Sequence, residues 1–312
     1  MGFGQGSGRD HLSDLTLQQA FAAYEGVRHR LPEVRDPAAA KPAQNLDAIA
    51  DQFDVFLLDA FGVLNIGETA IDGVPARVAG LQRAGKRVLV VTNAAGYPHA
   101  SLMAKYARLG YRFETGDVIS SRKTILHTLR AEPGLRWGLM ATQSLGRDDF
   151  EGLDITYLAE DPAAYDAAQG FLLMGSAVWT EGRQALLVAS LRENPRPVLV
   201  GNPDIVAPRE QGFSKEPGYF AHRLADETGV QPRFFGKPFE NIYSLVFDHL
   251  GPDVDRTRVV MVGDSLHTDI LGAQTAGIKS ALISGYGFFG ASDVTGPIAS
   301  SGIYPDYVLE RP

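Results

Sequence analysis

Short apolar runs alternate along this chain with segments whose apolar residues recur at helical spacing. The clearest run, residues 53–58, ends on Asp59 and is followed by Gly62, where the chain can turn away. Apolar runs of this length are typical of strands buried on both faces of a parallel sheet. Further strands are predicted at 86–92, 118–120, 258–262, 280–283 and 307–309, and helices at 76–84, 99–109, 122–129, 239–250 and 269–276. This alternation predicts an α/β fold with a doubly wound parallel sheet.

The rhythm changes near residue 132, where Glu, Pro and Gly follow one another. The segment 131–233 contains its own strand-like runs, at 137–141, 171–174 and 198–200, and a helix at 180–193. We therefore expect residues 131–233 to form a second, α/β domain inserted into a core of residues 46–130 and 234–312. Residues 1–45 are predicted to form a helix, at about 15–24, and a linker rich in Pro and Ala, and a short helix at 45–52 leads into the first strand.

Composition narrows the class of protein without identifying a function. The 312 residues carry 29 basic and 37 acidic side chains, a formal net charge of −8, and no basic stripe that would favour nucleic acid or an anionic membrane as a partner. The absence of cysteine excludes disulfides and thiolate chemistry. No apolar run reaches the roughly 20 residues that cross a bilayer, and the polar, Gly-rich amino terminus lacks the apolar core of a signal peptide, so a cytoplasmic location is expected.

Polar residues of complementary kinds follow the predicted strands or begin the predicted helices. They are Asp59, Thr92, Asn93, Lys237, Asp264 and Asp269. Taken singly, each also fits a plain role as a strand-closing acid, a turn residue or a surface lysine. Together they can converge, because the carboxyl ends of parallel strands share one rim of the sheet. Acids suit Mg²⁺, and a lysine at a helix start suits a phosphate, so the set predicts catalysis through an aspartyl-phosphate.

The segments that carry these residues resemble, in order, the four motifs of the haloacid dehalogenase (HAD) superfamily. They are Asp-Ala-Phe-Gly-Val-Leu at 59–64, Val-Thr-Asn at 91–93, Gly-Lys-Pro at 236–238 and Gly-Asp-Ser-Leu-His-Thr-Asp-Ile at 263–270. The insert between the second and third motifs resembles the C2-type cap of class IIA, the subgroup that contains NagD-type enzymes, 4-nitrophenylphosphatase and pyridoxal phosphatase. The resemblance covers about residues 51–310.

The resemblance implies a role for each matching position. Catalysis and phosphate binding would fall to Asp59 as nucleophile, Lys237 as the screening charge, and Thr92 and Asn93 as phosphate ligands. Mg²⁺ would be held by Asp59, the backbone carbonyl of Phe61 and Asp264, with Asp269 supporting the metal's waters or Lys237. In the cap, Asn202 and Asp204 belong to a segment similar to one that faces the active site in the subgroup, although the same segment could be a plain turn. Relatives with such caps often pair through them, so a homodimer is also expected.

One position departs from the family pattern. Phosphatases of the superfamily usually have a second Asp two residues after the nucleophile, which transfers protons to the leaving group and from water, but here that residue is Phe61. General acid–base help is worth about 10² to 10⁴ in rate. The substitution therefore predicts a slow enzyme, a need for a good leaving group, or a replacement acid from the cap, for which Asp204, Glu210 and His222 are candidates.

Three functions remain open from the sequence. The first is a Mg²⁺-dependent phosphatase of a small phosphorylated metabolite, of the sugar phosphate or nucleotide class. The second is a phosphate-ligand binding or regulatory protein with attenuated turnover, which Phe61 motivates. The third is a hydrolase like the 2-haloacid dehalogenases, which resemble the Asp-x-aromatic-Gly pattern but work without metal, whereas Asp264 and Asp269 together suit a cation.

Overall fold

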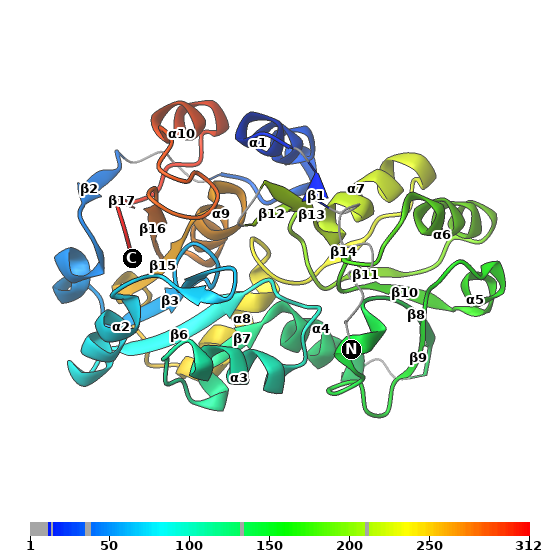
Figure 1. Ribbon diagram of the computed structural model, residues 1–312, viewed down its shortest axis with the longest axis horizontal. Coiled ribbons are helices and arrows are strands. Elements are labelled where there is room, and N and C mark those ends of the chain that lie inside the picture. The colour runs from blue at the N-terminus through cyan, green and yellow to red at the C-terminus, as the bar shows by residue number, and fades with distance from the viewer. Residues whose placement is uncertain (1–11, 14, 35–38, 132–133, 210–211) are drawn as a thin grey trace, which may run out of the picture.

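The computed structural model describes residues 12, 13, 15–34, 39–131, 134–209 and 212–312. Its larger sheet has seven parallel strands in the order β2-β17-β16-β15-β3-β6-β7 (Figure 1). Their bounds are β2 Lys41–Ala43, β3 Val55–Leu58, β6 Arg87–Thr92, β7 Val118–Ser120, β15 Val259–Gly263, β16 Lys279–Ile283 and β17 Tyr307–Leu309. The strand order reverses between β3 and β15, which makes the carboxyl ends of these two strands the expected place for a ligand.

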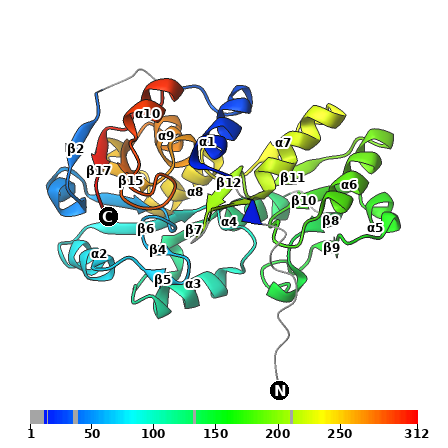
Figure 2. The same cartoon turned by 45° about the horizontal axis from the view of Figure 1, so that its top comes forward.

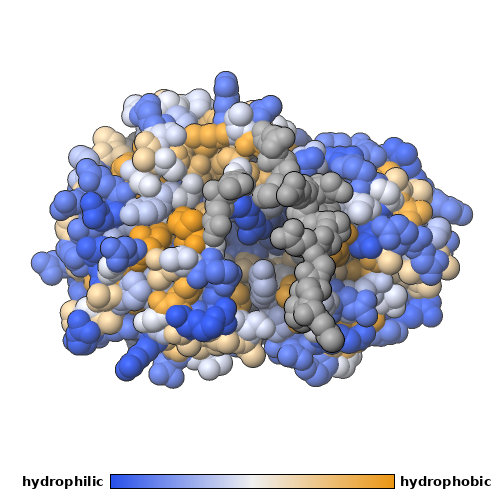
Figure 3. Space-filling model, viewed as in Figure 1, coloured by the Kyte–Doolittle hydropathy of each residue, from blue (hydrophilic) through white to orange (hydrophobic). Residues whose placement is uncertain are grey.

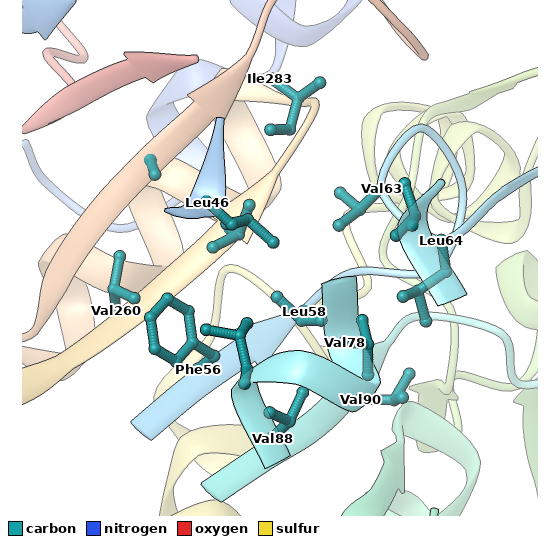
Figure 4. Packing of buried hydrophobic residues seen from close by; sticks show 14 of the residues in the cluster. Leu46, Phe56, Leu58, Val63, Leu64, Val78, Val88, Val90, Val260 and Ile283 are labelled. Carbon is teal, nitrogen blue, oxygen red and sulfur yellow. The ribbon is translucent and has the colours of Figure 1, made fainter. Parts of the chain in front are cut away.

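Helices cover both faces of this sheet, which explains why its strands are continuous apolar runs. They are α2 Val74–Arg83, α3 His99–Arg108, α4 Ser121–Ala131, α8 Glu240–Leu250, α9 Leu271–Ala276 and α10 Thr295–Ser301. Along β3, Phe56 and Leu58 pack in a cluster with α2 and α3 (Figure 4). Val55 and Leu57, on the other face, pack with α8 and α9. Each is at most 3% exposed, and full burial of such a side chain is worth about 1.5–3 kcal/mol. Packing on both sides therefore fixes the position of β3 and of the residue after it.

The inserted segment forms a second sheet, in the order β14-β11-β10-β8-β9, all parallel. Its strands are β8 Arg136–Met140, β9 Asp154–Tyr157, β10 Gly170–Leu173, β11 Val198–Val200 and β14 Arg233–Phe234, and its helices are α5 Pro162–Ala167, α6 Glu181–Glu193 and α7 Pro217–Thr228. This sheet and its helices form the lobe on the right of Figure 1. The prediction of a doubly wound α/β core with an α/β cap is confirmed. The cap sheet extends through Phe234, one residue past the predicted boundary.

A smaller antiparallel sheet and the N-terminal helix lie where the two lobes meet (Figure 2). The sheet consists of β1 Leu12–Ser13, β13 Phe213–Lys215 and β12 Val206–Pro208, and the helix is α1 Leu17–Gly26. Thr16 begins the helix through a capping box with Gln19. Tyr24 of α1 contacts the cap: its hydroxyl accepts from the Ile205 N–H (3.2 Å) and donates to the Val206 carbonyl (3.3 Å). The helix therefore belongs to the junction between core and cap.

The remaining short elements correct several sequence predictions. Residues 41–43, predicted as linker, form strand β2 beside β17. The helix predicted at 45–52 is a 3-10 helix, η2 Leu46–Gln52, and the one predicted at 269–276 begins as a π-helical turn, η6 Leu266–Ile270, before α9. The other elements are a hairpin of β4 Asn65–Ile66 and β5 Thr69–Ala70 and the 3-10 turns η1 Arg28–Arg30, η3 Thr115–Asp117, η4 Gln143–Leu145 and η5 Arg256–Arg258.

Hydrophilic side chains cover most of the periphery of both lobes on the face shown in Figure 3. In the described part of the chain, no helix combines the length and the apolarity needed to cross a bilayer.

Candidate active site

Three carboxylates meet at the reversal of strand order in the larger sheet. Asp59 follows β3 directly, and its backbone N–H donates to the Val262 carbonyl of β15 at 2.9 Å. Asp264 follows β15, and Asp269 lies in the π-helical turn after it. One oxygen of each of the three acids lies within 4.8 Å of the others. The sheet thus brings together acids that the sequence separates by about two hundred residues.

A buried lysine links two of these carboxylates. The Lys237 Nζ lies 2.6 Å from Asp59 Oδ1 and 2.6 Å from Asp269 Oδ1, and its side chain is only 2% exposed. Burial alone would lower the pKa of Lys237, but the carboxylates of Asp269 and Asp59 outweigh it and raise that pKa above its usual value. The ammonium form is therefore held in place beside Asp59.

Three carboxylates lie around the ammonium group of Lys237, and burial together with this excess of negative charge raises the pKa values of Asp264 and Asp269. Burial, together with the charges of Asp269 and Asp59, raises the pKa of Asp264 well above its usual value. Burial also raises the pKa of Asp269, to about 6, although Lys237 opposes the shift. A second positive charge at this place would relieve the crowding of negative charge.

The oxygen atoms at and near Asp264 are suitable ligands for a hard cation such as Mg²⁺, which prefers oxygen. The Phe288 N–H donates to Asp264 Oδ2 at 2.7 Å and orients the carboxylate. Gly287 and Gly62 leave the space that Asp264 fills, because a Cβ built on them would lie 1.8 Å and 2.6 Å from Asp264 Oδ2, and both have positive φ. Among the described hydrogen bonds of the turn, none uses the Phe61 carbonyl oxygen, which therefore remains available as a metal ligand.

The residues predicted to bind phosphate border the same place. Thr92 ends β6, is 4% exposed, and accepts a hydrogen bond from the Ala94 N–H at its hydroxyl oxygen (3.3 Å). Asn93 holds the segment that carries Lys237: its Oδ1 accepts from the Lys237 N–H (2.8 Å), and its Nδ2 donates to the Lys237 carbonyl (2.9 Å). Core strand β6 and the Lys237 loop are thereby fixed to each other.

One of the two predicted cap residues reaches this network. Asp204, in the loop after β11, accepts a hydrogen bond at Oδ1 from Asn93 Nδ2 (2.8 Å). Asn202 instead supports the loop, since its Oδ1 accepts from the Asp204 N–H (3.0 Å) and its Nδ2 donates to Glu216 (3.1 Å). The segment is a turn, as one reading of the sequence allowed, and the turn directs Asp204 to the core.

The other two cap candidates for a replacement acid, His222 and Glu210, are not found at the carboxylate cluster among the described residues. His222 is 2% exposed and stacks on Phe234, with 4.8 Å between ring centroids, and the charged or titratable groups that influence it are Arg30, Asp226 and His29. It therefore lies apart from the carboxylate cluster. Glu210 lies outside the described residues.

The sequence reading did not identify Gly287 and Phe288. They follow β16, a neighbouring strand of the sheet, and supply the space and the backbone donor that orient Asp264. The only signal in the sequence is the Gly-Tyr-Gly at 285–287 after a predicted strand. A backbone N–H leaves no mark on residue type, so this contact requires coordinates.

Comparison with known proteins gives a consistent family. Residues 56–155 match a family model described as haloacid dehalogenase-like hydrolase, and residues 234–311 match a second one, described as HAD-hydrolase-like. Glycerol-3-phosphate phosphatase of Gallus gallus is 29% identical over 290 residues, which cover 84% of this chain and 91% of the relative. Chronophin of Homo sapiens is 32% identical over 241 residues, covering 72% and 79%.

A solved structure shows the same fold. The crystal structure of a possible sugar phosphatase of the HAD superfamily from Cytophaga hutchinsonii superposes with a TM-score of 0.75 at 23% identity. The match covers 88% of this chain and 98% of that chain, so it includes both the core and the cap.

Proposed function

Because this chain belongs to the haloacid dehalogenase-like hydrolases, in class IIA, we propose that it is a Mg²⁺-dependent phosphatase of a small phosphorylated metabolite. The observation that carries the proposal is the Lys237 ammonium, held 2.6 Å from both Asp59 and Asp269 beside a third carboxylate, Asp264. This set pairs a nucleophile with the positive charge that its reaction with a phosphate dianion requires.

Each of these residues has its own role in a reaction of two steps. A carboxylate oxygen of Asp59 attacks phosphorus while the ester P–O bond breaks, which leaves an aspartyl-phosphate and an alkoxide that must take up a proton to leave as the alcohol. Water then attacks phosphorus and releases inorganic phosphate and the Asp59 carboxylate. Lys237 screens the repulsion between Asp59 and the phosphate, and the Thr92 hydroxyl and the backbone N–H of Asn93 bind phosphoryl oxygens.

A metal fits this account without changing these roles. Asp59, the Phe61 carbonyl and Asp264 would hold Mg²⁺, and Asp269 would support its waters or Lys237. Bound there, Mg²⁺ would neutralise charge that develops on the transferring phosphoryl group.

The names of the relatives suggest the class of substrate. Two relatives are glycerol-3-phosphate phosphatases, from Gallus gallus and Homo sapiens, and a third is a 4-nitrophenylphosphatase from Schizosaccharomyces pombe. We therefore favour a small phosphomonoester, such as a sugar or polyol phosphate, over a macromolecule. Pairing of two chains through the cap and a cytoplasmic location remain predictions.

The direct test is phosphate release from a panel of small phosphomonoesters with Mg²⁺. Asp59→Asn should lower kcat/KM by about 10³ or more, because the amide cannot act as nucleophile. Asp72→Asn, which changes an exposed carboxyl of the core, is the matched control and should leave the rate unchanged. Hydrolysis that is absent from wild type, or that persists in Asp59→Asn, would refute the proposal. Undiminished turnover of haloacids in EDTA would favour the dehalogenase reading.

Phe61 supports one second candidate, a protein that binds a phosphorylated metabolite without efficient turnover. Its side chain is partly exposed and offers no group that can transfer a proton. Calorimetry beside the phosphate-release assay separates the two functions. Tight binding without turnover would support the second candidate, and rapid release of phosphate would rule it out.

A further inference from the structure

Resting on the proposed phosphatase function, we infer that Asp204 of the cap is the general acid and base of the reaction, in the role that Phe61 cannot perform. The carboxyl reaches the site from the cap and is hydrogen-bonded to Asn93, the predicted phosphate ligand. Its other oxygen accepts no hydrogen bond among the described residues and is available to carry a proton.

The loop that carries Asp204 is built to hold it in one position. The Asn202 side chain accepts a hydrogen bond from the Asp204 N–H and donates one to Glu216, which is buried (7% exposed). Gly218 at the start of α7 lets this loop pack closely, because a Cβ there would lie 2.2 Å from the Pro203 carbonyl oxygen. A preorganised carboxyl of this kind needs little rearrangement to act on a bound substrate.

The contact with Asn93 joins the carboxyl to the loop that carries Lys237. The Asn93 side-chain NH₂ donates to both Asp204 Oδ1 (2.8 Å) and the Lys237 carbonyl (2.9 Å). A single amide therefore joins Asp204 to the loop whose ammonium contacts Asp59. A phosphoryl group bound by the Thr92 hydroxyl and by the backbone N–H groups around Asn93 would lie beside the side chain that holds Asp204, and its ester oxygen would face this carboxyl from the core side.

The surroundings of Asp204 favour a carboxyl that exchanges protons near neutral pH. Burial raises its pKa to about 7, although the Asn93 hydrogen bond and Lys237 lower it, and Glu216 and Asp59 add to the rise. After burial, the charge of Asp204 is the next contribution that raises the pKa of the nearby Tyr24 hydroxyl. A group with a pKa near the working pH can both give and take a proton.

The proton steps then balance. Protonated Asp204 gives its proton to the ester oxygen as the P–O bond breaks and the bond from Asp59 to phosphorus forms. The Asp204 carboxylate next takes a proton from water as the water oxygen attacks phosphorus. Phosphate leaves, Asp59 is regenerated as a carboxylate, and Asp204 is again protonated.

The other cap groups near the loop are less suited to this step. Both side-chain oxygens of Glu216 are engaged, Oε1 by Arg209 (2.7 Å) and Ser214 (2.5 Å) and Oε2 by Asn202 (3.1 Å). The pKa of His222 is lowered by burial to about 4, so that it is neutral at neutral pH, and it stacks on Phe234 away from Asp59.

The experiment compares two substrates, glycerol phosphate, whose alkoxide must be protonated as it leaves, and 4-nitrophenyl phosphate, whose nitrophenolate leaves without a proton. Asp204→Asn can still accept the Asn93 hydrogen bond but cannot transfer a proton. We expect kcat/KM for glycerol phosphate to fall by about 10² to 10⁴, with much smaller loss for 4-nitrophenyl phosphate. Asp154→Asn, at an exposed position of cap strand β9, is the matched control.

A second readout needs no variant. In wild type, kcat/KM for glycerol phosphate should decline above about pH 7 relative to that for 4-nitrophenyl phosphate, because the acid is then deprotonated. Equal losses on both substrates in Asp204→Asn, or a ratio that does not vary with pH, would overturn the assignment. Loss of both activities in Asp59→Asn together with either of these results would leave the proposed function standing. A wild type inactive on both substrates would overturn both.

Discussion

Phe61 is the main difference between this site and that of a phosphatase whose proton donor lies on the core domain, because it stands where such an enzyme has an Asp. It lies two residues after Asp59, where its carbonyl oxygen remains available but its ring cannot titrate. A carboxyl at position 61 would act from the core, and Asp204 acts from the cap. If both can serve the same proton transfer, the effects of changing them must be non-additive.

A double-mutant cycle tests this relation. Phe61→Asp should raise kcat/KM for glycerol phosphate by at least about tenfold in the Asp204→Asn background, and by less in wild type, where a proton donor is already present. Phe61→Leu is the control, because it opens the same space without a carboxyl. The same factor in both backgrounds, or an equal gain with Leu, would mean that proton transfer is not what Phe61 limits.

The crowded carboxylates also predict how Mg²⁺ affects stability. Burial and the neighbouring charges raise the pKa values of Asp264 and Asp269, so the metal-free folded protein holds protons that the unfolded chain releases. Their contribution to the free energy of unfolding is therefore present at low pH and is lost as pH rises above the usual carboxyl range, for Asp269 through its folded pKa of about 6.

Because Mg²⁺ must displace those protons, its own stabilising effect should grow over the same range. The rise in Tm on adding Mg²⁺ should be small at about pH 5 and larger at about pH 7.5, measured by thermal unfolding with and without EDTA. Asp264→Asn should remove most of this effect. A rise in Tm that is the same at both values of pH would contradict a metal site at these carboxylates.

At the scale of elements, helix α1 connects the cap to the core. The Tyr24 hydroxyl bonds to the backbone of Ile205 and Val206 in the cap, and its ring stacks on His267 of the core, 4.9 Å between centroids. Glu25 of the same helix accepts a hydrogen bond at Oε1 from His267 Nε2 (2.5 Å). The helix thus contacts both lobes close to the loop that carries Asp204.

Tyr24→Phe should therefore lower the free energy of unfolding by about 1–3 kcal/mol, because the Ile205 N–H loses its partner in a buried place. Urea unfolding measures the change. Tyr97→Phe removes the same hydroxyl from a residue that is 49% exposed, and it should cost less than about 0.5 kcal/mol. Equal effects of the two variants would mean that the α1 contact does not hold in solution.

The elements that the sequence predicted correctly are those with a strong apolar pattern. Strands such as β3 and β15 are buried on both faces, so continuous apolar runs reveal them. Strand β2 was not predicted because it is a three-residue edge strand with Lys41 and Pro42 exposed and with the proline in its centre. The contact of α1 with the cap was also beyond prediction, since one tyrosine carries no sign of its distant partner.

The same contrast applies to the site. The acids and Lys237 could be placed near one another because they follow strands of one parallel sheet or begin a helix beside it. The sequence could not reveal which cap acid faces the core, because that depends on how the loop after β11 meets Asn93. Likewise, the Phe288 amide that orients Asp264 is a backbone group without a sequence signature.

For the whole molecule, the account depends on how the cap sits on the core. The two lobes approach closely at Gly96 of the core and Gly175 of the cap: a Cβ built on Gly175 would lie 3.4 Å from the Cα of Gly96. The chain contains no cysteine, so a cysteine pair placed here could form only one intramolecular disulfide.

Gly96→Cys combined with Gly175→Cys should form this disulfide on mild oxidation, since the backbones are within the range that a disulfide can bridge. The oxidised form should gain about 2–4 kcal/mol in free energy of unfolding over the reduced form. Each single variant, which cannot close the link within one chain, is a control. Failure of the double variant to cross-link would show that the two lobes do not meet as described.

The measurement that tests the central claim most directly is a single-turnover acid quench with a radiolabelled phosphomonoester substrate and Mg²⁺. A phosphatase that works through Asp59 should show label transferred to the peptide that contains Asp59, dependent on Mg²⁺ and absent from Asp59→Asn. Hydrolysis at the wild-type rate in Asp59→Asn, with no label on the protein, would contradict the account.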